Sequence, residues 1–141
     1  MNAWLYQMVT DDSWSPEHFR VTVWQGKDIT WAHSKVLAAG NRKPTPGDPV
    51  IFFFAKKGTK HPGIYGWGVV IKVYAKKEEF TFRAAPPTDL LKMDPLWDNE
   101  TEGLVDSIRG KVPLGTTWAI SPDQYAALAL KIRVHASSTR A

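Results

Sequence analysis

The chain of 141 residues contains no cysteine, which excludes disulfides, zinc–thiolate sites and cysteine nucleophiles and is typical of a reducing compartment. Its four histidines have no paired spacing, so the sequence predicts no metal site. No apolar run approaches the length of a membrane span, and residues 1–10 lack a basic segment followed by an apolar one. We therefore expect a soluble, cytoplasmic protein without a membrane or metal partner.

Nucleotide-binding and hydrolase signatures are missing as well. There is no P-loop, no GxGxxG before a helix and no GxSxG, while Gly63, Gly66 and Gly68 fall inside a strand pattern rather than at a helix start. The chain has 14 acidic residues, but nothing singles out a catalytic pair among them. The sequence accordingly predicts no cofactor and no catalytic residue.

Charge is unevenly distributed along the chain. The formal net charge is +4; residues 41–83 carry nine Lys or Arg and three acids, whereas residues 84–106 carry six acids and one Lys. A basic middle suits a polyanionic partner, because phosphate neutralisation dominates affinity for nucleic acids. A solvated strand rim is the alternative reading of the same lysines.

Aromatic residues are the most informative feature present, with seven Trp and six Phe. Trp67 lies between two glycines, and Phe52, Phe53 and Phe54 cannot all face one core, because side chains alternate along a strand. We expect Phe52 and Trp118 in the core. For the remaining rings a core position and a pocket for a flat ligand such as a nucleobase stay open, with stacking worth about 1–3 kcal/mol per base.

Periodicity and turn signals predict a mixed α+β domain around a small, twisted, barrel-like sheet with short flanking helices. The expected strands are residues 3–9, 19–24, 50–55, 64–74, 79–84 and 116–120, and the expected helices are 30–39, 104–109 and 121–133. A helical turn with Ser15 as cap and Pro16 first is the alternative to the second strand. We expect one domain over residues 1–134 and a flexible tail over 135–141.

Several segments occur in the order found in one known family: AWLYQMV, DDSW, WAHSKVLAAG, PGDPVIFFF, PGIYGWGVV and GTTWAISPDQYAAL. In this order, over about residues 3–132, the chain resembles the EVE domain, a PUA-like fold related to the YTH readers of N6-methyladenine and to ASCH domains. The resemblance implies a PUA-like barrel with an aromatic pocket for a modified base, such as 5-methylcytosine, in DNA or RNA. Carried over by position, the pocket residues are Trp14, Trp31, Ser34, Phe53, Phe54 and Trp67.

Three functions follow from these observations. The leading hypothesis is a non-catalytic reader that flips a modified base into the pocket and works with an effector protein in trans. Its basic rim would contact the nucleic-acid backbone through Arg42, Lys43, Lys56, Lys57 and Lys60. The alternatives are an ASCH-like nucleoside amidohydrolase that uses Lys35, and a protein-interaction module that docks a partner through Leu96 and Trp97.

Overall fold

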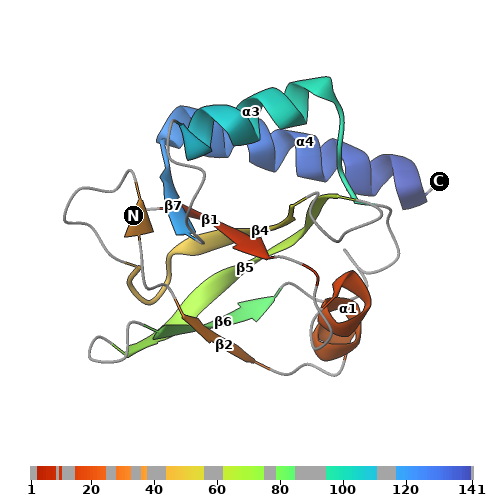
Figure 1. The fold of residues 1–141 in the computed structure, drawn as a ribbon. Coiled ribbons are helices and arrows are strands. Elements are labelled where there is room, and N and C mark those ends of the chain that lie inside the picture. The colour runs from red at the N-terminus through yellow and green to blue at the C-terminus, as the bar shows by residue number, and fades with distance from the viewer. Residues whose placement is uncertain are drawn as a thin grey trace.

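The computed structural model describes residues 3–8, 10, 15–24, 28–32, 36–37, 44–55, 62–74, 79–84, 95–110 and 117–140. They form one mixed sheet and three helices (Figure 1). The strands are β1 (Ala3–Met8), β2 (Ile29–Ala32), β3 (Val36–Leu37), β4 (Pro49–Phe54), β5 (Gly63–Tyr74), β6 (Glu79–Ala84) and β7 (Thr117–Ile120). The helices are α1 (Pro16–Trp24), α3 (Asn99–Arg109) and α4 (Pro122–Arg140).

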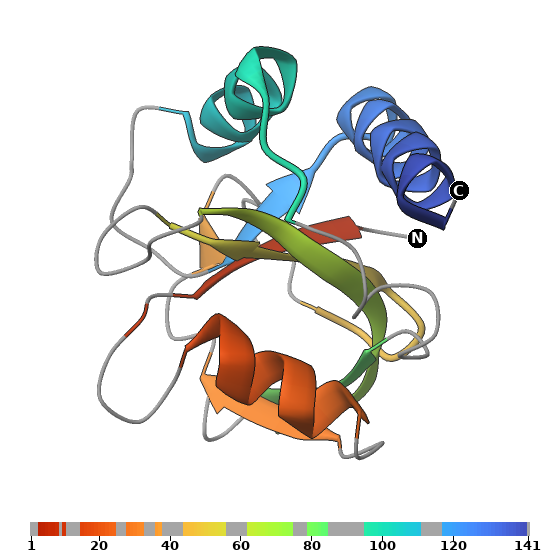
Figure 2. The same cartoon turned by 90° about the vertical axis from the view of Figure 1, so that its right-hand side faces the viewer.

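The sheet has the strand order β2-β6-β5-β4-β1-β7-β3, with parallel pairing of β1 to β4 and of β3 to β7. Its two edge strands are separated in the chain by residues 33–35 alone. That link spans at most about 14 Å, whereas seven flat strands would put the edges about 29 Å apart. The sheet must therefore curl, as Figure 2 shows, although β2 and β3 do not pair with each other in the described part.

Helices lie on both sides of the sheet. α3 and α4 lie on the convex side, and α1 lies on the concave side (Figure 2). β1 supplies both layers by alternation: Leu5 belongs to the cluster under α3 and α4, while Trp4 and Tyr6 belong to the cluster that includes Phe19 of α1. Burial raises the pKa of the Tyr6 hydroxyl. We call these two clusters the convex core and the concave core.

The expected strands at 3–9, 50–55, 64–74, 79–84 and 116–120 are confirmed, with ends within one residue. The expected strand at 19–24 is wrong, because these residues form α1. The Phe19 amide donates to the Ser15 carbonyl over 3.0 Å, and the His18 amide donates to Ser15 Oγ over 3.3 Å. The cap with Pro16 at the first helical position therefore outweighs the apolar alternation that suggested a strand.

The expected helix at 30–39 is also wrong. Residues 29–32 pair antiparallel with β6, and residues 36–37 pair parallel with β7. The β-branched and aromatic side chains of Ile29, Thr30 and Trp31 favour a strand, and pairing with β6 decides the outcome. The helix predicted from residue 104 begins earlier, at Asn99, and α4 continues to Arg140, so residues 135–140 of the expected tail are helical.

Asp98 connects the start of α3 to α4. Its carboxylate accepts the Thr101 amide at 2.7 Å and lies 3.1 Å from Lys131 Nζ, which also reaches Glu100 at 3.4 Å. The hydrogen bond from Thr101, followed by the contact with Lys131, lowers the pKa of Asp98 to about 2. The cap therefore also links the first turn of α3 to Lys131 of α4.

We predict that Asp98→Ala lowers the free energy of unfolding by about 1 kcal/mol, the usual value of an N-cap. Because the folded pKa is depressed, the carboxylate contribution is complete above about pH 4 and is lost as the pH falls toward 2. Urea unfolding at pH 7 and pH 3 measures both effects. Asp98→Asn keeps a capping oxygen, so it should retain most stability at pH 7 but lose the wild-type pH dependence; equal pH dependence in both proteins would contradict this assignment.

Candidate nucleic-acid interface

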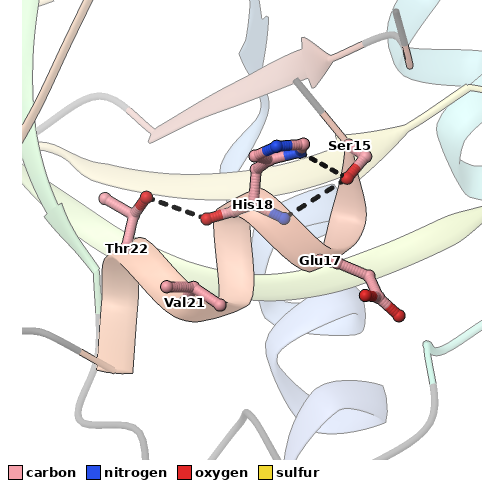
Figure 3. A pocket seen from close by; sticks show the side chains of 5 residues that line it. All are labelled: Ser15, Glu17, His18, Val21 and Thr22. Atoms are coloured by element: carbon pink, nitrogen blue, oxygen red, sulfur yellow. Dashed lines mark hydrogen bonds between the residues drawn. The ribbon is translucent and has the colours of Figure 1, made fainter. Parts of the chain in front are cut away.

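A surface hollow of about 570 Å³ lies along the exposed side of α1 (Figure 3). Its described lining consists of Ser15, Glu17, His18, Val21 and Thr22. Ser15 Oγ lies 2.7 Å from His18 Nδ1, and the Thr22 hydroxyl donates to the His18 carbonyl over 2.8 Å. The hollow is open to solvent, and its described lining comes from α1 and its cap alone. The hollow combines an apolar surface at Val21, which is 55% exposed, with polar groups that are partly engaged within the helix.

The opposite side of α1 fixes the helix to the concave core. The Phe19 ring lies 5.2 Å from Phe52 and 6.1 Å from Phe54, and the Arg20 guanidinium lies 5.1 Å above the Tyr65 ring. Large apolar contacts of this kind hold a short helix that has little stability of its own. The hollow is thus formed on a helix that is fixed by its packing. The Ser15-Pro16 cap is the sequence signal that could have predicted this helix.

Phe53 and Phe54, two of the predicted pocket residues, are in the protein interior. Phe53 is 2% exposed and stacks on Trp97 with ring centroids 5.4 Å apart, and Phe54 is 0% exposed and meets Tyr65 edge-on at 5.2 Å. A base could reach either ring only by displacing these neighbours. We therefore correct this part of the predicted pocket: β4 is covered on both faces, so its alternating rings enter two different cores.

Trp67 is placed differently, on the convex side of the sheet. It pairs with Ile51 across β4 and β5, and directly paired residues share a face. Ile51 belongs to the convex core and is 1% exposed, whereas Trp67 is 39% exposed. The Trp67 ring is therefore available to a ligand, but on the face opposite the concave core in which α1 is anchored.

Trp31 is in β2 opposite Phe80 of β6, and Phe80 is opposite Val73 of β5. Val73 and Trp67 are six residues apart, about 20 Å along a strand. The structure therefore does not bring Trp31 and Trp67 together as two walls around one base. The remaining predicted residues lie outside the described part of the chain: Trp14, Ser34, Arg42, Lys43, Lys56, Lys57 and Lys60, together with Lys35.

Leu96 and Trp97, the docking pair in the alternative of a protein-interaction module, pack within the fold. Leu96 is 5% exposed and exchanges two backbone hydrogen bonds with Ile64, of 2.9 and 3.0 Å. Trp97 is half-buried against the Phe53 ring. The segment therefore forms an antiparallel bridge beside the start of β5, and its apolar side chains are not an open docking surface.

The Pro46-Gly47-Asp48 turn holds β4 against β1. The indole nitrogen of Trp4 donates to Asp48 Oδ2 over 2.9 Å, and the Thr45 amide donates to the same oxygen over 2.9 Å. Asp48 is 3% exposed and Gly47 has φ of +94°. This motif is part of the family resemblance, and in this chain its carboxylate has a structural role that sequence reasoning did not assign.

The described ranges were compared with the requirements of a metal site and of a membrane-spanning helix. They contain no group of three or more His, Asp or Glu that could hold a metal ion. Their helices also lack the combination of length and apolar character that a membrane span requires.

The fold has an α+β, PUA-like architecture, as the sequence predicts. No family model and no curated protein sequence matches the chain. Among solved structures, it resembles a hypothetical protein from Leishmania major, with 17% identity, 94% and 95% coverage of this and that chain, and a TM-score of 0.58. A protein from Pseudomonas putida has 14% identity, 92% and 99% coverage and a TM-score of 0.59.

A third similar structure is human THYN1 protein in complex with DNA that contains 5-methylcytosine. It has 14% identity to this chain, 93% and 98% coverage and a TM-score of 0.56. The DUF55 domain of human thymocyte nuclear protein 1 is similar as well, with a TM-score of 0.54. At these identities the likeness establishes a shared fold over nearly the whole chain.

Proposed function

We propose that this chain is a non-catalytic reader of a modified nucleobase, of the 5-methylcytosine type, in DNA or RNA. The observation that carries the proposal is the likeness, over 93% of the chain, to a protein whose structure contains 5-methylcytosine DNA. The order of sequence segments independently resembles the EVE domain, and we propose that the chain is one. Because fold alone is a weak guide to ligand, the proposal depends on both observations together.

We place the base pocket at the α1 side of the curled sheet. Trp14 directly precedes Ser15 of the hollow, and Ser34 follows β2 by two residues. Trp31 would stack on the base, and Ser34 would read a polar edge. The proposed pocket excludes Phe53 and Phe54, because both rings are buried in the protein core. Arg42, Lys43, Lys56, Lys57 and Lys60 would contact the phosphate backbone, which gives affinity while the pocket gives selectivity.

A reader without catalytic residues needs a partner that acts on the marked nucleic acid. We propose an effector protein in trans, in the cytoplasm, that uses this domain to find modified sites. The basic middle of the sequence supports a nucleic-acid partner.

The test is a tryptophan-fluorescence titration with matched single-stranded oligonucleotides that carry cytosine, 5-methylcytosine or N6-methyladenine. We expect tighter binding to one modified oligonucleotide than to its unmodified match. Trp31→Ala should remove this preference and weaken binding of the modified oligonucleotide about tenfold, because base stacking is worth about 1–3 kcal/mol. Leu130→Ala, an exposed apolar truncation on α4, serves as the control and should change neither value. Equal affinity for all oligonucleotides would refute the reader function.

A further inference from the structure

The convex side of the sheet is only partly covered by helices. A row of side chains crosses four strands in register: Trp118 of β7, Leu5 of β1, Ile51 of β4 and Trp67 of β5. The first three are 0–1% exposed under α3 and α4, and Trp67 is 39% exposed. Figure 1 shows the same boundary, with both helices over β1, β4 and β7 and away from β6 and β2. Beyond Trp67 this face of β5 and β6 carries further accessible side chains.

Two cations share this uncovered face with Trp67. Val69 lies on the Trp67 side of β5 and pairs with Arg83 of β6, while Lys72 pairs with Thr81. Because Arg83 and Thr81 are two residues apart on one strand, Arg83 and Lys72 point to the same side. The Arg83 side chain is 64% exposed, and Lys72 is exposed with its Nζ 5.0 Å from the centroid of the Tyr74 ring.

Arg83 is held at present by an ion pair with Asp28, with Nε 3.0 Å from Oδ1. An exposed ion pair of this kind contributes little stability. A phosphate could therefore exchange with the Asp28 carboxylate at small cost. Glu79, which pairs with Tyr74 two residues from Thr81, occupies a position on the same face. The described residues of this face thus combine an exposed indole, a phenol ring and two cations with two acidic residues, Asp28 and Glu79.

We propose that this face of β5 and β6 binds single-stranded nucleic acid next to the modified base. The face is defined by Trp67, Lys72, Tyr74 and Arg83, and we name it the β5–β6 platform. Trp67 stacks on a base of any identity, and Lys72 and Arg83 contact phosphates. An exposed indole beside two cations favours single-stranded nucleic acid over a protein partner, because the ring can stack on a base while the cations contact phosphates. The inference rests on the proposed function for the class of partner, but it concerns a different face of the sheet.

Dimensions agree with this role. Trp67 and Lys72 are about 16 Å apart along an extended strand, and Arg83 is one strand away and two residues along, about 8 Å from Trp67. A stacked base and its neighbouring phosphates fit within these separations. The platform lies opposite the concave core, so it would hold flanking nucleotides and leave base selection to the α1 side.

The experiment uses an unmodified oligothymidylate of about twelve nucleotides, a length within single-strand binding footprints. It contains no cytosine, so its binding does not depend on a methylcytosine pocket. We expect Trp67→Ala to weaken binding about tenfold. Replacing both cations, Lys72→Gln with Arg83→Gln, should reduce the slope of log K against log salt by about 0.7 per lost phosphate contact. The matched controls on α4, Leu130→Ala and Arg133→Gln, should change neither quantity.

Circular dichroism checks that each variant folds, and Trp67→Leu, which keeps apolar bulk but lacks a flat ring, provides a second variant if the alanine one does not fold. Unchanged oligothymidylate binding by a folded Trp67 variant would overturn the platform, even if the 5-methylcytosine preference persists. Loss of the preference alone on Trp67→Ala would also overturn it, because Trp67 would then belong to the base pocket. Conversely, weaker oligothymidylate binding by Trp67→Ala in a protein without any modification preference would support the platform and refute the reader function.

Discussion

Replacing Asp48 with alanine is expected to lower the free energy of unfolding by about 3 kcal/mol, because it leaves a buried indole N–H and a backbone amide without their acceptor. The acceptor oxygen serves Trp4 and Thr45 at 2.9 Å each, and Trp4 is 0% exposed. The indole N–H of the fully buried Trp4 would lose its acceptor inside the protein, which carries the larger share of this cost. In a chain of this size such a loss corresponds to a fall in Tm of about 10 °C. Urea unfolding followed by tryptophan fluorescence measures it.

Asp48→Asn provides the matched control. Both donors use the same oxygen, Oδ2, so an amide oxygen in that position can accept both bonds. We therefore expect Asp48→Asn to lower the free energy of unfolding by about 1 kcal/mol. Trp4→Phe removes the indole donor and should show a similar loss, in addition to any change in packing. If the asparagine and alanine variants were equally unstable, the two hydrogen bonds would not be the cause. Because Asp48 has a structural role, the fraction of the alanine variant that remains folded should still bind ligand.

Strands were the most predictable part of this fold, because unbroken apolar runs and alternation mark them directly. Residues 50–55 and 64–74 carry such runs, and both are strands. The errors at 19–24 and 30–39 have opposite causes. In the first, a local cap outweighs alternation; in the second, pairing with β6 outweighs a helix-like composition. The first competition is local, and more weight on the Ser15-Pro16 cap would have decided it correctly. The second cannot be decided without knowing that residues 29–32 meet β6.

The candidate site was less predictable for a related reason. Alternation shows that Phe53 and Phe54 point in opposite directions, but not that both directions are covered. Here α3 and α4 cover one face of β4 and α1 is anchored on the other, so both rings are core. Trp67 is exposed because the helix layer ends at β5, a property of the packing rather than of its flanking glycines.

The second large effect is expected for Gly63→Ala, at the start of β5. Gly63 has φ of +148°, and an added Cβ would lie 2.8 Å from the Leu96 carbonyl oxygen and 3.1 Å from Trp97 Cβ. The Leu96 backbone is hydrogen-bonded to Ile64 through both its amide and its carbonyl group. It therefore cannot move away from an added Cβ without breaking that bridge. Strained φ together with overpacking is expected to cost about 3 kcal/mol of unfolding free energy.

Gly103→Ala tests whether this cost comes from the close approach or from replacing glycine as such. Gly103 is in α3, has no atom within 4 Å of an added Cβ and has no positive φ. Alanine there should raise the free energy of unfolding by up to about 1 kcal/mol, because it favours the helix. Urea unfolding should thus give opposite signs for the two substitutions. An unchanged stability of Gly63→Ala would show that residues 95–98 do not pack on β5 as described. The stacking of Trp97 on Phe53 would then also be in error, because it depends on the same close approach of Leu96 to Gly63.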